Sequence, residues 1–577
     1  MAKKCSALLT VMANTRIFIP FVLLSLIICG INGRAVYSEI RTSLGGIIGT
    51  SFITRNGRNI SAFLRIPYAQ PPIGYLRFQN PLAALPWKGI LVADKIAPPC
   101  PQIDDYGKFI GVEDCLFLNV YTPRIDVNTS YPTMVYLHGG AFQKGDARPS
   151  YLGPDFILDK DVVLVTLHYR LGPLGFLSTG DTSAPGNFGL KDQALALRWV
   201  QENIENFGGD PKSVTLFGHS AGSASVNFQV LSPTTKGLFH RFIAQSGSAL
   251  SPWAFSPSNK YKEYAFRLGQ SLNCSTNSSE LLIDCLREVE PYILLSNKGV
   301  FSGVQELSGV TWVPTDEPDI SGAFLTEHPL QYILQNKIPD LPNINGVVKN
   351  EGLVVTAKLY ANDTLYDEVV GDISHFLRLL STVFSKDKDP DKVANALNDF
   401  YFKDIDSTNK SQVLSKLTDL IGDVSFTFPQ LLQLQLVSER IKSPCYLYSF
   451  EYRGKYSKTA FILNNDRNIG ITHADELIYL YPSSPELFNT TEAVKLSELD
   501  YRMIDIMIDM WTNFAITGVP TTNYSDDPHV WKPFWRENFY LQISANMKNG
   551  ISLSQRSELL EKRMHFLALE MIKLNFG

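Results

Sequence analysis

The stretch Ser213-Val-Thr-Leu-Phe-Gly-His-Ser-Ala-Gly222 decides the fold of this chain. Residues 213–217 are mostly β-branched or apolar, which favours a strand. Residues 223–230 contain no glycine or proline, which favours a helix. Gly218 and Gly222 flank Ser220 and allow a tight turn in which larger side chains would clash. A strand therefore passes through a sharp turn directly into a helix, with Ser220 at the tip.

The segments around this stretch also alternate between strand and helix. Apolar positions at helical spacing predict a helix over residues 190–204, and residues 557–574 have helix-forming composition. Short apolar runs that predict strands are residues 133–137, 162–167, 344–348 and 445–450. A continuous apolar run is typical of a strand that is covered on both faces. This order predicts an α/β fold with a large, mostly parallel central sheet and helices on both faces.

The composition limits the class of protein. The chain has 577 residues, of which 45% are hydrophobic and 19% charged. This balance supports a substantial core and excludes a disordered or collagen-like chain. Lys and Arg number 52 and Asp and Glu 57, for a net charge of −5. With no basic tract, the sequence gives no electrostatic basis for binding nucleic acid.

The N-terminal segment is apolar enough to interact with a membrane. Residues 17–31 are apolar and follow Lys3, Lys4 and Arg16. The run is shorter than the roughly 20 residues that cross a bilayer, which predicts a signal peptide over residues 1–33. A retained signal anchor is the alternative. We expect a secreted, extracellular protein with no stable membrane span after signal removal.

Cysteines and glycosylation sequons fit the secretory route. Removing the signal peptide leaves five of the seven cysteines, and counting alone leaves their pairing open. Local spacing favours disulfides Cys100–Cys115 and Cys274–Cys285, with Cys445 as a buried free thiol in a strand. No Cys-x-x-Cys or Cys/His cluster suggests a metal site. The predicted glycosylation acceptors are Asn59, Asn128, Asn277, Asn362, Asn409, Asn489 and Asn523, with Asn273 a weaker candidate.

Ser220 and an upstream pair of glycines have the chemistry of a nucleophilic site. The turn lifts the Ser220 hydroxyl beside a helix N-terminus, where backbone N–H groups can stabilise an oxyanion. Gly139 and Gly140 follow the strand of residues 133–137, so bare N–H groups there can approach a substrate carbonyl. Either motif alone could be an ordinary turn. Their occurrence in this order argues against two unrelated turns.

An ordered series of motifs resembles the type-B carboxylesterases, the family that includes the cholinesterases. The resemblance runs from about residue 43 to the C-terminus. The stretches that carry it include Arg65-Ile-Pro-Tyr-Ala-Gln-Pro-Pro-Ile-Gly74, Glu113-Asp-Cys-Leu-Phe-Leu-Asn-Val-Tyr121, Asn187-Phe-Gly-Leu-Lys-Asp-Gln193 and Gln245-Ser-Gly247. His219 and Ala141 are variants that resemble those of secreted insect-type esterases.

The resemblance implies an α/β-hydrolase fold in a single domain, residues 36–577. It also implies a catalytic triad of Ser220, Glu351 and His473. The backbone N–H groups that it implies for the oxyanion hole are those of Gly139, Gly140, Ala141 and Ala221. It places Ser246 near the triad acid and Trp253 in the wall of the acyl pocket, and it pairs Arg77 with Glu113 and Arg170 with Asp192.

The implied activity is hydrolysis of a small-molecule carboxylic ester through an acyl-enzyme, without cofactor or metal. Two other functions stay open at this stage. One is a juvenile-hormone-type esterase, whose motif often has Gln where His219 stands. The other is a catalytically inactive, cholinesterase-like adhesion module, against which the presence of all three triad residues argues. The sequence leaves the oligomeric state and the natural ester undetermined.

Overall fold

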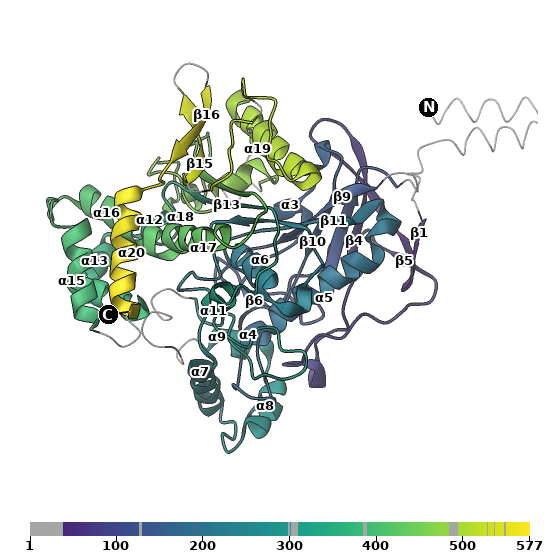
Figure 1. The fold of residues 1–577 in the computed structure, drawn as a ribbon. Helices are drawn as coiled ribbons and strands as arrows, with labels where there is room; N and C mark the ends of the chain where they lie inside the picture. The colour runs from purple at the N-terminus through teal and green to yellow at the C-terminus, as the bar shows by residue number, and fades with distance from the viewer. Residues whose placement is uncertain are drawn as a thin grey trace, which may run out of the picture. The chain divides into compact units, whose positions relative to one another are not determined.

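One large β-sheet is the central feature of the structure, a computed structural model (Figure 1). The structure describes residues 39–125, 130–297, 301, 310–384, 389–483, 488, 494–527, 529–535, 537–546 and 550–576. Over these residues the sheet has eleven strands. In order across the sheet they are β16 (Gly550–Ser557), β15 (Phe539–Asn546), β14 (Cys445–Glu451), β13 (Asn343–Val348), β12 (Arg241–Gln245), β11 (Gly209–His219), β9 (Tyr131–Leu137), β10 (Val163–Leu167), β8 (Phe117–Thr122), β4 (Asn59–Pro67) and β3 (Thr50–Ile53).

The middle of this sheet is parallel. Neighbouring strands from β15 through β14, β13, β12, β11 and β9 to β10 all pair in parallel. Among the described strands of this sheet, antiparallel pairs occur only towards its two edges. They join β15 to β16 at one edge, and β10 to β8, β8 to β4 and β4 to β3 at the other. The prediction of a large, mostly parallel sheet is confirmed.

Helices cover both faces of the sheet, which explains why central strands such as β9, β10 and β13 are buried along most of their length. In β9, Val135 and Leu137 pack into one hydrophobic cluster with α5 (Phe188–Asn203) and α6 (Ala221–Leu231). Met134 and Tyr136 pack into a second cluster with α19 (Glu498–Thr517). Successive side chains of a strand point to opposite faces. The two clusters are therefore the two cores of the α/β fold predicted from the sequence.

Further elements surround the sheet. Short strands form two small sheets, one of β1 (Glu39–Thr42), β2 (Gly45–Ile48) and β5 (Ile90–Val92), the other of β6 (Gln102–Ile103) and β7 (Phe109–Ile110). The remaining α-helices are α3 (Pro149–Leu152), α4 (Gly172–Phe176), α7 (Ser258–Ser271), α8 (Ser279–Arg287), α9 (Pro291–Ser296), α11 (Pro329–Leu334), α12 (Leu353–Ala361), α13 (Asp363–Val370), α14 (Ile373–Phe384), α15 (Pro390–Tyr401), α16 (Lys410–Gly422), α17 (Phe428–Ser438), α18 (Thr459–Leu463) and α20 (Glu561–Phe576).

The C-terminal helix begins later than the sequence predicts. Helix-forming composition suggested a start at Ser557, but α20 begins at Glu561. Ser557 is instead the last residue of β16, where it pairs with Phe539 of β15. The β-hairpin formed by β15 and β16 decides this boundary, because its hydrogen bonds hold Ser557 in an extended conformation.

Several sequence predictions concern covalent features. Cys100 is bonded to Cys115 and Cys274 to Cys285, the pairs that local spacing favours, and Cys445 is a buried free thiol. The acceptors Asn59, Asn277, Asn362, Asn409 and Asn523 are exposed, as is Asn273. The signal peptide, Asn128 and Asn489 lie outside the described residues. Glycosylation therefore stays a prediction.

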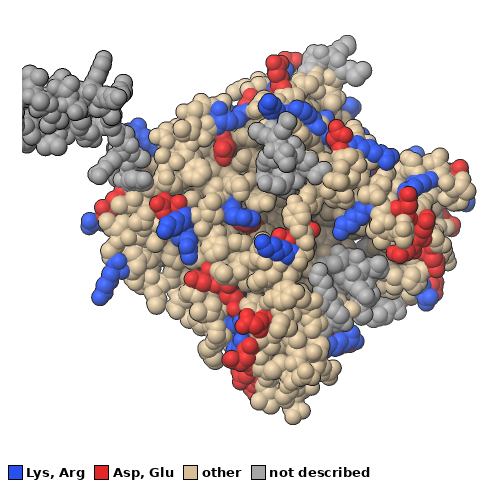
Figure 2. All heavy atoms as spheres, turned by 180° about the vertical axis from the view of Figure 1, so that it is seen from behind, with Lys and Arg blue, Asp and Glu red and all other residues tan. Residues whose placement is uncertain are grey.

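Charges of both signs are interspersed over the face seen in Figure 2. None of the helices in the described ranges is long and apolar enough to cross a membrane. Among the side chains that the structure describes, no group of three or more His, Cys, Asp or Glu could hold a metal ion. The ion pairs implied for Arg77 with Glu113 and Arg170 with Asp192 are both formed, at 2.6 and 2.7 Å.

Candidate active site

Ser220 lies at the tip of the turn between β11 and α6, in a strained conformation. Its φ of 58° and ψ of −124° lie outside the regions that non-glycine residues usually adopt. The flanking glycines make the turn sterically possible. A Cβ on Gly218 would lie 2.8 Å from the Leu137 carbonyl oxygen, and one on Gly222 only 2.0 Å from it. The backbone N–H of Ser220 donates to the Gln245 carbonyl at 2.8 Å, which ties the turn to the end of β12.

Among the described residues, backbone N–H groups without partners occur in the two segments that meet at Ser220. Ala221 is the first residue of α6, so its N–H has no acceptor within the helix. The loop after β9 brings Gly139 against the turn, because a Cβ on Gly139 would lie 3.0 Å from the Ser220 Cβ. The N–H groups of Gly140 and Ala141 donate to no acceptor within the parts of the chain described. Three unpaired donors from two segments therefore lie near one hydroxyl.

His138 holds this glycine loop in place. Its ring stacks on Tyr169 with centroids 4.3 Å apart, and the Tyr169 hydroxyl donates to the His138 carbonyl at 2.7 Å. Burial lowers the pKa of His138 to about 4, so the ring is neutral at physiological pH. Gly140 and Ala141 have φ values of 114° and 56°. Glycine adopts this region without strain and alanine does so at a cost, which the packed loop must offset.

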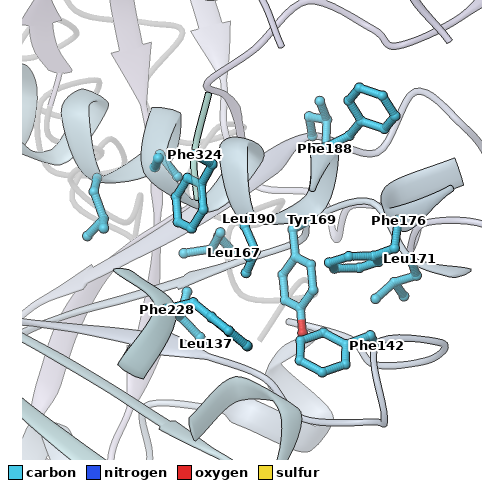
Figure 3. Packing of buried hydrophobic residues seen from close by; sticks show 14 of the residues in the cluster. Leu137, Phe142, Leu167, Tyr169, Leu171, Phe176, Phe188, Leu190, Phe228 and Phe324 are labelled. Atoms are coloured by element: carbon cyan, nitrogen blue, oxygen red, sulfur yellow. The ribbon is translucent and has the colours of Figure 1, made fainter. Parts of the chain in front are cut away.

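Phe142 anchors the other end of the loop in the hydrophobic core. Figure 3 shows its ring among Tyr169, Leu171 and Phe176 of the cluster that covers one face of the sheet. The Phe142 and Phe176 rings meet edge to face, with centroids 5.1 Å apart. Fixing both ends of the loop keeps its N–H groups oriented before any ligand binds, which is the condition for electrostatic stabilisation of an oxyanion.

Glu351 and His473 form a short hydrogen bond beside this turn. His473 Nδ1 lies 2.6 Å from Glu351 Oε2, and the two side chains are only 8% and 1% exposed. Glu351 follows β13, and its Oε1 accepts the Val348 N–H at 2.9 Å. A bridge between Asn350 and Thr472 joins the two loops directly. The carboxylate therefore has a fixed orientation, and Nδ1 is the nitrogen that donates to it, which leaves Nε2 for another partner.

Two aromatic rings enclose the His473 imidazole. The Phe426 ring lies 4.6 Å from it and the His219 ring 4.4 Å from it, centroid to centroid. His219 immediately precedes Ser220, so its contact brings His473 to the turn. Within the part of the chain that the structure describes, no hydrogen bond joins Ser220 to His473. Such catalytic bonds are often long in unliganded enzymes and shorten only when substrate binds.

A family model described as the carboxylesterase family matches residues 37–567. The chain belongs to the carboxylesterase family. It is 36% identical over 505 residues to a juvenile hormone esterase of Tribolium castaneum, which covers 85% of this chain and 84% of that protein. It is 36% identical over 496 residues to a carboxylic ester hydrolase of Bombus ignitus, covering 84% and 86%. Its identity to esterase FE4 of Myzus persicae is 35% over 508 residues, covering 86% of each chain.

Membership in the carboxylesterase family gives the reaction class, serine-dependent hydrolysis of carboxylic esters. It also agrees with the α/β-hydrolase fold that the resemblance implied. The sheet, the order of its strands and the helices on both faces belong to that fold.

The resemblance implied roles near the site for Trp253 and Ser246. Trp253 packs among aromatic rings, whereas Ser246 is buried without a hydrogen-bond partner for its hydroxyl among the described residues. Trp253 is half-buried and packs on Phe426, with ring centroids 5.6 Å apart, while its Nε1 donates to the Ser425 carbonyl at 2.8 Å. The Phe142 ring also lies near Trp253, with its centroid 6.5 Å from that of Trp253. We call the rings of Phe142, Trp253 and Phe426 the aromatic wall. Ser246 is fully buried in the turn after β12, and its hydroxyl has no hydrogen-bond partner among the described residues.

Two residues of this carboxylesterase site were missed by the sequence analysis. Glu476 is fully buried, its Oε1 lies 3.7 Å from His219 Nε2, and burial together with the charge of Glu351 raises its pKa to about 8. Glu476 lies three residues after His473, and this short spacing could have indicated from the sequence that it belongs to the site. Phe426 contacts His473 from a segment far away in the sequence, and no local pattern there indicates a site.

Proposed function

We propose that this protein is a secreted serine carboxylesterase in which Ser220 is the nucleophile, His473 the general base and acid, and Glu351 the residue that orients His473. The hydrogen bond between Glu351 and His473 next to the strained turn of Ser220 carries the proposal. A buried carboxylate, an imidazole and a serine in that order are the arrangement that activates a hydroxyl for acyl transfer.

Acylation would begin with the attack of Ser220 Oγ on the ester carbonyl carbon. His473 Nε2 takes the hydroxyl proton as the new C–O bond forms, and Glu351 stabilises the charged imidazolium. The carbonyl oxygen becomes an oxyanion, which the N–H groups of Gly140, Ala141 and Ala221 stabilise. When the tetrahedral intermediate collapses, His473 gives its proton to the departing alkoxide. The products of this half-reaction are the free alcohol and an ester of Ser220.

Deacylation repeats these steps with water. His473 Nε2 takes a proton from water while the water oxygen attacks the acyl carbon of the Ser220 ester. The second oxyanion uses the same N–H groups, and its collapse returns the proton to Ser220 Oγ. The carboxylate product then leaves. Each step uses only residues of this chain, the ester and water.

Covalent labelling tests the assignment of Ser220. An organophosphate should form one adduct per chain, and peptide mass spectrometry should place it on Ser220. Ser220→Ala should retain the fold but lose at least about 10⁴-fold in kcat. Ser213→Ala, in the middle of β11, should keep wild-type turnover as the matched control. An adduct on another serine, or full turnover by Ser220→Ala, would contradict the proposal.

A juvenile-hormone-type esterase is the second candidate. The relative from Tribolium castaneum, at 36% identity, favours it. His219 stands where that class often has Gln, and we therefore rank a general esterase first. A kinetic comparison of juvenile hormone with p-nitrophenyl esters of increasing acyl length decides between them. A kcat/KM for the hormone more than tenfold above that for every p-nitrophenyl ester would favour the hormone esterase.

Secretion and glycosylation belong to the same proposal. Cleavage of residues 1–33 would release the domain of residues 36–577, and the exposed acceptors Asn59, Asn277, Asn362, Asn409 and Asn523 are accessible for glycans. Expression in insect cells should put activity in the medium, and glycosidase treatment should lower the apparent mass. Activity that stays with the cell membrane would favour the retained signal anchor.

A further inference from the structure

A π-helical turn lies between the catalytic histidine and the C-terminal helix. α16 continues into the π-helix η6 (Asp423–Thr427), which continues directly into α17. π-turns occur mostly as single insertions within α-helices and are frequent at functional sites, because the wider turn changes where side chains point. Here the turn contains both Ser425 and Phe426.

Both of these residues contact the proposed active site. The Phe426 ring lies 4.6 Å from the His473 imidazole and 5.6 Å from the Trp253 ring. The Ser425 carbonyl accepts the Trp253 indole N–H at 2.8 Å. The position of η6 therefore sets the place of two rings of the aromatic wall, Phe426 directly and Trp253 through the Ser425 carbonyl.

The first residue of η6 is held by a buried network. Asp423 is 1% exposed, and its carboxylate accepts the Tyr401 hydroxyl at 2.7 Å. Arg563 Nη2 donates to the other carboxylate oxygen at 2.9 Å, and Arg563 Nε lies 2.8 Å from the first. Burial raises the pKa of Asp423 to about 7, and the positive charge of Arg563 limits that rise. Arg563 therefore favours the ionised form of the Asp423 carboxyl group.

Arg563 belongs to the C-terminal helix α20, so its ion pair joins that helix to η6. It also pairs with Asp419 of α16, at 2.8 Å. α20 packs on the same group of helices, since the Phe566 ring stacks on Phe400 at 4.0 Å and Leu567 shares a hydrophobic cluster with Val424. Figure 1 shows α20, in yellow, beside the helices that precede η6.

We propose that Arg563 and Asp423 are positioning residues of the esterase site: their partly buried ion pair fixes η6, and η6 fixes the Phe426 ring and the Ser425 carbonyl that bound the acyl pocket. The inference rests on the proposed function, because it needs Ser220 and His473 as the reacting groups. Neither Arg563 nor Asp423 touches the substrate. Their effect is on the size of the acyl group that the site accepts.

Acyl-chain selectivity tests the inference. We would measure kcat/KM for p-nitrophenyl acetate, butanoate and octanoate with Arg563→Met, Asp423→Asn and the double variant, after counting active sites with an organophosphate. Each single variant should raise the octanoate-to-acetate ratio at least fivefold, because a displaced Phe426 enlarges the pocket. The double variant should shift the ratio no further than either single variant, since both remove the same interaction. Lys562→Met, an exposed residue on the same helix, should leave the ratio within twofold of wild type.

Phe426→Leu gives an independent measurement when a charge variant fails to fold. It should reproduce the selectivity shift with α20 and the ion pair intact. An equal loss of kcat/KM for all three esters in Arg563→Met or Asp423→Asn would overturn the proposal, because that outcome reports only lost stability. A shift in Phe426→Leu with none in the folded charge variants would also overturn it. Failure of the proposed function would be seen separately, as wild-type protein that the organophosphate does not label at Ser220.

Discussion

The imidazole ring of His219 lies 4.4 Å from the ring of His473, at an interplanar angle of 46°. Two histidines in contact could both titrate near neutral pH and complicate the pH dependence of the enzyme. Burial, followed by the charge of His473, lowers the pKa of His219 well below its usual value. His219 therefore stays uncharged near neutral pH, and it packs against His473, the proposed base, without accepting its proton.

His219→Gln should therefore leave the shape of the pH profile unchanged. The acidic limb of kcat/KM should have the same slope in wild type and variant, because His219 stays uncharged and adds no ionisation there. The plateau value of kcat/KM should fall less than about tenfold, because the variant loses only one ring contact with His473. A measured slope of two protons in wild type that becomes one in the variant would contradict the neutral His219.

Glu476→Gln should change how stability depends on pH. The pKa of Glu476 is raised from 4.5 to about 8 in the folded protein, so folding favours its protonated form. That contribution is fully present below about pH 4.5 and is lost as the pH rises to about 8. The variant cannot ionise, so its advantage over wild type should grow from pH 5 to pH 8, to a few kcal/mol at most.

The measurement is the difference in unfolding free energy between variant and wild type at pH 5, 6, 7 and 8. Asp475, whose pKa burial raises to about 6, titrates in both proteins and largely cancels from the difference. Glu439→Gln, at an exposed position, is the control and should show no trend. A difference that is constant with pH would mean that Glu476 is ionised in the folded protein.

Local sequence patterns could predict the turn of Ser220 and the loop of Gly139 to Ala141. Both are defined by residues within a few positions, namely a strand, glycines and a helix. His473 could not be chosen from the residues alone, because Glu351 is its partner across 122 positions and pairing depends on how the loops after the strands meet. Only the family resemblance indicated that position.

Tertiary contacts explain the remaining differences. The start of α20 depends on the pairing of Ser557 with Phe539, which no pattern of helix formers can reveal. Phe426 lies in the π-helical turn η6, and the buried Asp423 pairs with Arg563 from the end of the chain. Each depends on segments that the sequence separates widely.

The cysteines should differ in reactivity and in their effect on stability. Burial raises the pKa of the Cys445 thiol to about 11, although a hydrogen bond from Asn343 opposes this, so little thiolate is present at pH 8. In the protein without its N-terminal segment, a thiol reagent should detect one cysteine per chain after unfolding and essentially none before. Peptide mapping without reduction that joins Cys445 to another cysteine would contradict this.

Removing Cys100–Cys115 should destabilise the protein. Replacing both residues by serine frees a loop with a sequence separation of 15, which costs roughly 3 kcal/mol in the chain-entropy model. Denaturant unfolding of this variant, with Cys445→Ala as the cysteine control, gives the value. An unchanged unfolding midpoint would show that the loop is ordered without its disulfide.

The loop between Cys100 and Cys115 also bears on substrate charge. A quaternary ammonium group cannot accept or donate a hydrogen bond, so sites select it mainly by contact with aromatic faces, worth roughly 0.5–2 kcal/mol each. The loop contains no Trp, and its aromatic residues are Tyr106 and Phe109. Their rings already meet other rings edge to face, Tyr106 with Phe461 at 5.6 Å and Phe109 with Tyr292 at 5.7 Å.

Two of the acidic residues of the same loop, Asp104 and Asp105, already have partners. Asp105 forms an ion pair with Lys144, and Asp104 accepts the backbone N–H groups of Tyr106 and Lys108 at 3.0 and 2.8 Å. Both carboxylates lie at the solvent-exposed end of the loop, where salt screens their attraction for a cation. The loop therefore offers a cationic alcohol group neither a Trp face nor an unpaired buried charge.

We expect acetylcholine to have no advantage over an uncharged ester of the same shape. Neohexyl acetate, in which a carbon atom replaces the ammonium nitrogen, should have a kcat/KM equal to or above that of acetylcholine, because desolvating the ammonium group costs free energy that no contact in this loop returns. Purified enzyme, assayed with both esters at one ionic strength, gives the ratio directly. Tyr106→Ala should leave that ratio within about twofold, because a Tyr ring attracts a cation less strongly than a Trp ring does. A preference for acetylcholine of tenfold or more, equivalent to about 1.4 kcal/mol, would mean that other residues bind the cation and that the enzyme is choline-specific.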